Sequence, residues 1–452
     1  MSDLALVGSD RSLTYEELMA DAEKVSAPML GRSLVFLRAQ NVIESVVGYV
    51  SFLSKGHVPV MLNDHLAPEV FADLLKRYRP EYVWGPNDGF VQGEPVLSYG
   101  SYALRRTSYE AHPVPDMHPD LALLLSTSGS TGSPKLVRLS YENLASNTDS
   151  IIEYLGITED DRAITTLPFS YSYGISIVNT HLKAHARIIL TDKTFMDRDF
   201  WNLLRQEGAT TFGGVPYSYA MLSRLRFRRM DVPSLRYLTQ AGGRLGEDLH
   251  REFAEVCEQK GMDFVVMYGQ TEATARMAYL PANRSLEKIG MIGVAIPGGS
   301  FSLEGDDGSV LQGADVEGEL VYSGRNVSWG YALDRSDLAN GDERGGVLKT
   351  GDVATRDEEG FYRIVGRKKR FLKLFGNRIG LDEVEALLAA KGVSAACVGS
   401  DDAMKICIES GDASKVRDMI ASALGIHPSA FHVVVMDALP RTQAGKIMYA
   451  SL

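Results

Sequence analysis

The sequence predicts an α/β protein, with a large N-terminal α/β domain that holds mostly parallel sheets and a small C-terminal α+β domain. Two observations point to this fold class. Through roughly the first 300 residues, short apolar stretches alternate with amphipathic segments of helical spacing, a pattern typical of βαβ units. Near the end of the chain, both the order of the elements and the sign of the net charge change.

Strands and helices of the N-terminal part are assigned from the apolar spacing. Ser33 to Leu37 and His57 to Leu62 are short and apolar, so each predicts a strand. Between them, Ala39 to Lys55 has apolar residues at helical spacing, so it predicts the connecting helix. Further strands are predicted at Leu121 to Leu125, Arg187 to Leu190, Tyr237 to Gln240 and Asp263 to Met267.

The C-terminal part predicts a separate small unit. Helical spacing at Leu381 to Ala390 and Ser414 to Leu424 alternates with strand-like segments at Met404 to Glu409 and His432 to Met436. Residues 367–452 contain 12 lysines and arginines against 9 acidic residues, although the whole chain is acidic. The basic run Arg367 to Arg370 is read as a solvated hinge. We therefore expect one domain over residues 1–367 and a second over 368–452.

Composition excludes several classes of protein. The chain of 452 residues has 47 lysines and arginines and 58 acidic residues, a formal net charge of −11, which argues against a nucleic-acid partner. No apolar run approaches the roughly 20 residues that span a membrane. The N-terminus lacks the basic and apolar regions of a signal peptide. We expect a cytoplasmic protein.

A glycine- and serine-rich loop, Ser126 to Lys135, follows the predicted strand at Leu121 to Leu125. Its small residues let consecutive backbone N–H groups line an anion, and Lys135 adds a positive charge. The expected ligand is a polyphosphate. The loop is not a Walker A sequence, because Gly132 is followed by Ser133 and Pro134 rather than by lysine.

Further motifs follow this loop in a fixed order. They are Tyr268-Gly269-Gln270-Thr271-Glu272, Thr350-Gly351-Asp352, Gly366-Arg367, and the segment Leu439 to Lys446 near the C-terminus. Together with the loop they resemble the adenylate-forming superfamily, which includes acyl-CoA synthetases, the adenylation domains of peptide synthetases and firefly luciferase. The resemblance extends from about Leu13 to the end of the chain.

The resemblance implies an ATP- and Mg²⁺-dependent reaction in which a carboxylate attacks the α-phosphate and gives acyl-AMP and pyrophosphate. The catalytic residues it implies are Lys446, Thr271, Glu272 and Arg367, with Glu272 as the Mg²⁺ ligand. The nucleotide-binding residues it implies are Thr127, Ser128, Gly129, Ser130, Thr131, Gly132, Lys135, Gly242, Gly243, Tyr268, Gly269, Asp352 and Arg367. In this scheme Tyr268 stacks on adenine, Asp352 binds the ribose hydroxyls, and Lys446 bridges the two reacting anions.

The resemblance also implies a mobile C-terminal domain. In this family that domain presents the lysine, here Lys446, for the first half-reaction. It then rotates and opens a tunnel for a thiol. The pivot falls two residues beyond the Gly-Arg pair, at Lys369.

The expected acyl pocket is aromatic and apolar with a few polar groups. Its residues are Tyr171, Val215, Tyr217, Gln240, Ala241, Met267 and Arg276. No carboxylate lies near Ser170, where amino-acid-activating relatives place one, so an α-amino acid is disfavoured. Arg276 is unexpected in such a lining. It is read as a surface or structural salt bridge, or else as a contact to a hydroxyl, carbonyl or second carboxylate of the acid.

The sequence leaves the acceptor open: a thiol is favoured, and amide formation or another nucleophile is the remaining alternative. No carrier-protein segment is found at either end of the sequence, so we expect transfer to free CoA or to the phosphopantetheine of a separate carrier protein, with CoA favoured. A luciferase-like oxygenase would share the first half-reaction and stays an alternative. A non-catalytic relative is disfavoured, because Glu272, Asp352 and Lys446 are all present.

Overall fold

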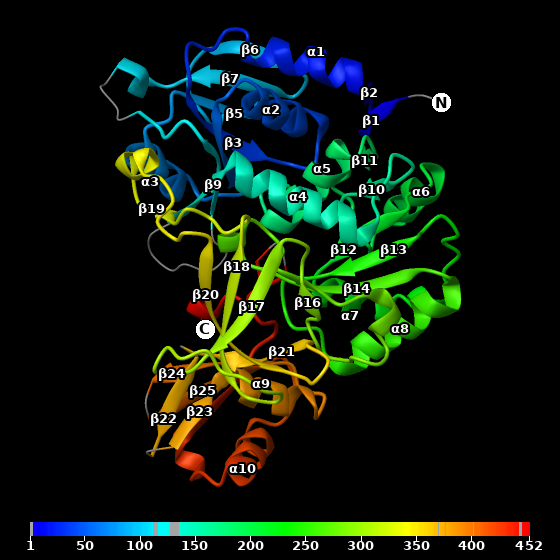
Figure 1. Cartoon of the computed structure of the whole chain (residues 1–452), viewed down its shortest axis with the longest axis vertical. Coiled ribbons are helices and arrows are strands. Elements are labelled where there is room, and N and C mark those ends of the chain that lie inside the picture. Colours follow the sequence, from blue (N-terminus) through cyan, green and yellow to red (C-terminus); the bar gives the residue numbers. More distant parts are fainter. Residues whose placement is uncertain are drawn as a thin grey trace. The chain divides into compact units, whose positions relative to one another are not determined.

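The structure is a computed structural model that describes residues 3–111, 116–126, 135–368, 370–375, 377–400, 402–442 and 445–452. The chain divides into two compact units (Figure 1). The first comprises residues 1–287, 295–300 and 323–348, and the second comprises residues 288–294, 301–322 and 349–452. The predicted domain boundary at residue 367 falls within the second of these units, and it stays a prediction.

Two large sheets form the first unit. One has the order β16-β15-β14-β13-β12-β10-β11-β1-β2. Its strands are β16 (Val294–Ala295), β15 (Ala278–Tyr279), β14 (Asp263–Tyr268), β13 (Tyr237–Gln240), β12 (Thr211–Gly214), β10 (Arg162–Ile164), β11 (Arg187–Ile189), β1 (Leu4–Val7) and β2 (Ser12–Thr14). The strands from β14 through β1 are parallel to their neighbours.

The other large sheet has the order β19-β9-β8-β4-β3-β5-β7-β6. Its strands are β19 (Tyr331–Ala332), β9 (Leu136–Ser140), β8 (Leu121–Ser126), β4 (Val58–Asn63), β3 (Leu34–Ala39), β5 (Tyr82–Pro86), β7 (Tyr102–Arg106) and β6 (Pro95–Tyr99). Only β8, β4, β3 and β5 run parallel, so this sheet is mixed rather than mostly parallel. Its outer strands are antiparallel because short connections join β6 to β7 and β8 to β9.

Helices connect these strands, as the alternation in the sequence predicts. They are α1 (Tyr15–Ser26), α2 (Ile43–Ser54), α3 (Pro68–Tyr78), α4 (Tyr141–Leu155), α5 (Ser172–Lys183), α6 (Arg198–Gln206), α7 (Pro216–Arg224) and α8 (Glu247–Lys260). Capping boxes begin two of them: Thr14 with Glu17 at α1, and Ser140 with Asn143 at α4. The predicted α/β class is therefore confirmed, and the helix predicted at Ala39 to Lys55 is α2.

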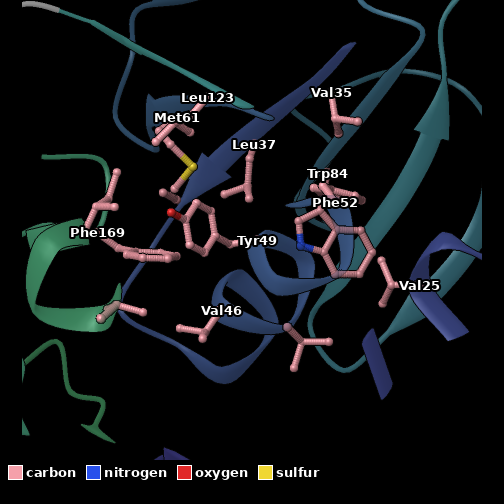
Figure 2. Close-up of a cluster of buried hydrophobic side chains, with 14 of the residues drawn as sticks. Val25, Val35, Leu37, Val46, Tyr49, Phe52, Met61, Trp84, Leu123 and Phe169 are labelled. Atoms are coloured by element: carbon pink, nitrogen blue, oxygen red, sulfur yellow. The ribbon is translucent and has the colours of Figure 1, made fainter. Parts of the chain in front are cut away.

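Helix α2 is apolar on nearly all sides, and it is buried for that reason. Figure 2 shows Val46, Tyr49 and Phe52 of this helix packed among Leu37, Trp84 and other side chains of the central core. Gly48 provides the space for Trp84, because a Cβ atom at Gly48 would lie 2.3 Å from the indole Nε1. That nitrogen donates to the carbonyl of Glu44 at 3.0 Å.

The second unit contains three small sheets. A four-stranded sheet has the order β17 (Gly299–Glu304), β18 (Gly318–Gly324), β20 (Val347–Arg356) and β21 (Tyr362–Arg367). A hairpin follows, made of β22 (Phe371–Leu374) and β23 (Asn377–Gly380). The last sheet is β24 (Ala395–Ser400), β25 (Ala403–Ile408) and β26 (Phe431–Val435), with helices α9 (Leu381–Ala389) and α10 (Ala413–Leu424). The predicted C-terminal α+β elements are confirmed.

We expect Gly48→Ala to lower the free energy of unfolding by about 1–3 kcal/mol, because the added methyl group overpacks the Trp84 site. Urea unfolding followed by tryptophan fluorescence measures this, since Trp84, Trp201 and Trp329 all lie in the first unit. Ser54→Ala on the same helix is the control, because within the described part of the chain the Ser54 hydroxyl donates only to the helix carbonyl of Ser51. Equal unfolding midpoints for Gly48→Ala and the wild type would contradict the tight packing.

Candidate active site

Three neighbouring parallel strands of the nine-stranded sheet end at the same edge. Gly214 of β12 is level with Gln240 of β13, and Gln240 is level with Val266 of β14. Ligands of open α/β sheets bind at such carboxyl ends. The ends of these strands and the segments that follow them contain eight of the predicted site residues: Val215, Gln240, Ala241, Gly242, Gly243, Met267, Tyr268 and Gly269.

Close packing joins three of the predicted residues. Gly242 has a φ of +83°, and a Cβ atom there would lie 2.7 Å from the Tyr171 hydroxyl and 3.1 Å from Cγ1 of Val215. Burial raises the pKa of Tyr171, which keeps its hydroxyl protonated at neutral pH. Tyr171, Val215 and Gly242 therefore form one contiguous wall. Tyr217 differs from them, because it is 46% exposed.

The chain after β14 turns back on itself in a tight loop. The backbone N–H of Met277 donates to the carbonyl of Tyr268 at 2.8 Å. Gly269 faces the returning strand so closely that a Cβ atom would lie 1.8 Å from the Ala275 carbonyl oxygen. Thr271 and Glu272 occupy the half-exposed tip of this loop, and Arg276 lies buried on its returning arm.

Glu272 is bound by a residue of the other large sheet. The hydroxyl of Tyr331, in β19, donates to Oε1 of Glu272 at 2.7 Å. Lys135 places its ammonium nitrogen 3.7 Å from the centre of the Tyr331 ring. Arg344 also lies over this ring, at 4.9 Å, and donates to the Glu272 carbonyl. Burial and the charge of Glu272 raise the pKa of Tyr331 to about 12.

Tyr331 and Arg344 are functional candidates that the sequence analysis missed. They lie 59 and 72 residues after Glu272 in the sequence, outside any motif with phosphate-binding spacing. Their positions follow from the pairing of β19 with β9, in which Tyr331 is level with Val137. No local pattern in the sequence predicts that pairing.

Arg276 is neither at the surface nor in a salt bridge with any carboxylate of the described residues, so the first reading of this residue is wrong. Its side chain is among the buried polar groups, 2% exposed. Nη1 donates to the Tyr154 hydroxyl at 3.2 Å and lies 3.3 Å from the sulfur of Met267. The guanidinium also lies 4.9 Å from the ring centre of Tyr173.

Asp352 and Arg367 face each other across two antiparallel strands of the second unit. They are level in the pairing of β20 with β21. Nε of Arg367 donates to Oδ1 of Asp352 at 3.0 Å. Asp352 is 4% exposed, so its carboxylate is held in one position by the strand and by the ion pair.

Lys446 lies in a tight turn of the C-terminal segment. The Lys446 carbonyl accepts from the backbone N–H of Thr442, and the Lys446 N–H donates to the Thr442 hydroxyl. Arg441 and Ile447 form an isolated β-bridge around this turn. Ile447 packs in a small core with Leu439 and Tyr449, which fixes the backbone of Lys446 to the C-terminal sheet.

Arg370 connects this C-terminal segment to the chain just beyond the predicted pivot. Its guanidinium forms ion pairs with Asp382 and Glu385 and lies 4.0 Å from the ring centre of Tyr449. The Tyr449 hydroxyl donates to the same Glu385 at 3.0 Å. We call this set the Arg370 cluster.

Some predicted residues lie outside the described part of the chain. They are Thr127, Ser128, Gly129, Ser130, Thr131, Gly132 and the predicted pivot Lys369. Among the described residues, no helix combines the length and the apolar character that crossing a membrane requires.

Comparison with known proteins identifies the family. A sequence model of the family described as AMP-binding enzyme matches residues 1–332. Indoleacetate–CoA ligase of Aromatoleum aromaticum is 32% identical over 395 residues, which are 84% of this chain and 74% of that protein. 2-Succinylbenzoate–CoA ligase of Listeria innocua is 26% identical and is covered nearly end to end, with 98% of this chain and 95% of that protein aligned.

The fold is also shared with a solved structure. O-succinylbenzoate coenzyme A synthetase from Bacillus subtilis, in complex with AMP, superposes with a TM-score of 0.79 at 22% identity, and the match covers 100% of this chain and 95% of that one. The chain therefore belongs to the family of AMP-binding enzymes. It is an AMP-forming ligase that activates a carboxylic acid with ATP and passes the acyl group to a thiol.

The buried histidine of α5 predicts a pH dependence of stability. His181 is 2% exposed, and burial lowers its pKa to about 4. The unfolded chain binds a proton near pH 6.5, so the free energy of unfolding falls as the pH drops from 6.5 towards 4. At pH 5 we expect this loss to be about 2 kcal/mol.

The variant His181→Asn removes this titration and keeps a donor near the Ile177 carbonyl, which His181 contacts through Nδ1. We expect the wild type to lose more stability than His181→Asn between pH 7 and pH 5 in urea unfolding. The exposed His65 provides the control His65→Gln, which should keep the wild-type dependence. Parallel pH profiles for His181→Asn and the wild type would show that His181 does not carry the effect.

Proposed function

We propose that Glu272, anchored by Tyr331 and adjacent to Lys135, forms the centre at which this ligase binds MgATP and activates its acid. One observation carries this assignment. Lys135 and Glu272, which are distant in the sequence, both contact the side chain of Tyr331. Lys135 is predicted to bind phosphate, and Glu272 is predicted to bind the metal. The Tyr331 hydroxyl occupies Oε1 of Glu272, and Oε2 has no partner among the described residues. A single free carboxylate oxygen suits Mg²⁺, which takes one or two carboxylates and completes its shell with phosphate oxygens and water.

The roles of the other nucleotide residues follow from their surroundings. Gly242 lies against Tyr171, so any side chain there would fill the space beside the strand ends, and this supports a flat ligand against the Gly242 and Gly243 backbone. Tyr268 supplies an aromatic ring at the end of the neighbouring strand. Asp352 is positioned by Arg367 to accept hydrogen bonds from two adjacent hydroxyls, as a ribose offers. The loop Thr127 to Lys135 holds the terminal phosphates in this proposal.

In the first half-reaction an oxygen of the acid attacks the α-phosphorus, and the bond to pyrophosphate breaks. Both reactants are anions, so catalysis depends on position and on neutralised charge. Thr271 orients the α-phosphate, Lys446 neutralises charge between the two anions, and Mg²⁺ polarises the phosphate oxygens when it is bound. In the second half-reaction the thiol sulfur attacks the carbonyl carbon, and AMP leaves.

We propose CoA as the acceptor, with the phosphopantetheine thiol of a separate carrier protein as the alternative. The two relatives named above are CoA ligases by name, which supports CoA. Their acids, indoleacetate and 2-succinylbenzoate, are aryl acids of moderate size. Tyr171, Val215 and Met267 belong to one hydrophobic cluster, which supports an acid of that class. Lys369 stays the proposed pivot, and the cytoplasm the proposed compartment.

Acid-dependent exchange of pyrophosphate into ATP, without any thiol, tests the first half-reaction. We expect exchange with a restricted set of carboxylic acids, followed by thioester formation when CoA is added. Thioester formation with a carrier protein and not with CoA would change the acceptor and leave the activation step in place. Absence of exchange across aliphatic, aryl, hydroxy, dicarboxylic and amino acids would overturn the proposed reaction.

Lys446→Ala should reduce pyrophosphate exchange by two to four orders of magnitude, about 3–5 kcal/mol of transition-state stabilisation, because no cation then bridges the two anions. The exposed Lys391 provides the control Lys391→Ala, which should exchange at the wild-type rate. A pyrophosphate-exchange rate of Lys446→Ala within threefold of the wild-type rate would show that Lys446 does not take part in the reaction.

Tyr331→Phe should raise the Mg²⁺ concentration required for half-maximal exchange by about 10–100-fold, because Glu272 loses a hydrogen bond worth about 1.5–3 kcal/mol to a charged group. Titration of exchange with MgCl₂ at fixed ATP measures this. Tyr99→Phe is the matched control, since the Tyr99 hydroxyl also donates to a carboxylate, that of Asp21. An identical Mg²⁺ requirement for Tyr331→Phe and Tyr99→Phe would refute the anchoring role.

A further inference from the structure

One edge of the Arg276 guanidinium has no hydrogen-bond partner among the described residues. Nη1 donates to the Tyr154 hydroxyl and faces the sulfur of Met267. No other hydrogen bond joins the guanidinium to the described residues, and Nε is fully buried without a partner. The Nε and Nη2 N–H groups point in parallel, which is the geometry that binds the two oxygens of a carboxylate.

The positive charge of Arg276 also lacks a counter-charge within the described residues. Arginine stays protonated in proteins, and a buried charge without a partner is strongly unfavourable. Asp161, a buried carboxylate of the same unit, is already paired with Arg236 at 2.7 Å. The neighbours of the guanidinium are aromatic residues and a thioether. An anion brought by a ligand would supply the missing charge.

The position of Arg276 connects it to the acyl pocket. Met267, which contacts Nη1, directly precedes Tyr268, the last residue of β14. Tyr173, which lies under the guanidinium, packs against the pocket residue Tyr171 with ring centres 6.3 Å apart. The loop that carries Arg276 on its buried arm carries Thr271 and Glu272 at its half-exposed tip. Arg276 is therefore more deeply buried than Thr271 and Glu272 of the same loop.

An unpaired polar atom and a small cavity lie beside this arm. The side-chain amide of Asn147 donates to the Arg276 carbonyl at 2.9 Å, and its Oδ1 is buried without a partner. Asn147 also lines a cavity of about 10 Å³, roughly the size of one water molecule. Ser172, Ser176 and Thr274 are polar residues of its lining, and Leu123, Leu125, Leu144 and Ile175 are apolar ones. Met267 has a flexible side chain that can move aside for a ligand group.

We propose that Arg276 binds a second anionic oxyacid group, a carboxylate or a sulfonate, at the far end of the acid substrate. This inference rests on the proposed function, because it assigns the acid that the Glu272 centre activates. The substrate class is then a dianionic acid, whose first carboxylate reacts and whose second anionic group is held by the Nε and Nη2 edge. A monocarboxylic acid would leave the buried charge of Arg276 unpaired in the complex.

Matched pairs of acids test this class with the wild-type enzyme. Each pair has one carbon skeleton, with and without the second anion: straight-chain monocarboxylic acids against α,ω-dicarboxylic acids of equal length, and arylalkanoic acids against their ring-carboxylated and ring-sulfonated forms. We expect at least one dianionic acid to exceed its monoanionic partner by tenfold or more in kcat/KM for pyrophosphate exchange. The sulfonated and carboxylated arms show which oxyanion is preferred.

Variants at Arg276 assign the preference to this residue. Arg276→Met, of similar length and without charge, should reduce the ratio within the preferred pair to below threefold, mainly through a higher KM for the dianionic acid. Arg276→Lys should keep part of the preference for the dianionic acid, since lysine retains the positive charge but lacks the two parallel N–H groups of the guanidinium. Arg284→Met, which removes an arginine paired with Glu287 outside the site, should keep the full ratio. ATP binding and the unfolding midpoint of each variant verify that it is folded.

The outcomes separate this inference from the proposed function. Exchange with monocarboxylic acids at rates equal to or above those of their dianionic partners would leave acid activation in place and overturn the role of Arg276. A preference for dianionic acids that persists in folded Arg276→Met would also overturn it. No exchange with any acid of the panel would overturn the activation reaction and the assignment of Arg276 together.

Discussion

The contact between Gly269 and the backbone of Ala275 is the constraint on which the candidate site depends. The two chain segments approach so closely that only a residue without a Cβ atom fits at Gly269. Because the two segments of the loop are in contact at this point, Thr271 and Glu272 lie at its half-exposed tip and Arg276 lies in the interior. A single turn of the chain thus supplies the residues assigned to phosphate, to metal and to the distant end of the acid.

The site also depends on the meeting of the two large sheets of the first unit. The nine-stranded sheet supplies Glu272, and the eight-stranded sheet supplies Tyr331 together with Lys135, which directly precedes β9. Tyr331 has two functions in this arrangement. Its hydroxyl fixes the carboxylate, and its ring lies near two cations, which attracts them through the electron-rich face. Charges of both signs are therefore in position before a ligand binds, which reduces reorganisation during reaction.

The α/β class and the main strands were predictable because apolar spacing is a local property of the sequence. The candidate site residues could be proposed from the sequence to the extent that they lie in short motifs, such as Tyr268 to Glu272 and Thr350 to Asp352. The partners of those residues were not predictable in the same way. Tyr331 reaches Glu272 only through the pairing of β19 with β9, and the burial of Arg276 results from the turn at Gly269. Both depend on contacts between distant segments, for which spacing along the chain carries no signal.

The Arg370 cluster has a mechanical consequence. Arg370 binds Asp382 and Glu385 of helix α9, and Tyr449 near the C-terminus closes the same group through Glu385. The first residue after the predicted pivot is thereby fastened to the segment that carries Lys446. A change in backbone torsion at the pivot would then move Lys446 together with Arg370, as parts of one rigid body. The position of Lys446 would then depend on the backbone torsions of the pivot alone. The small core that contains Leu439 and Ile447 would keep the segment around Lys446 rigid.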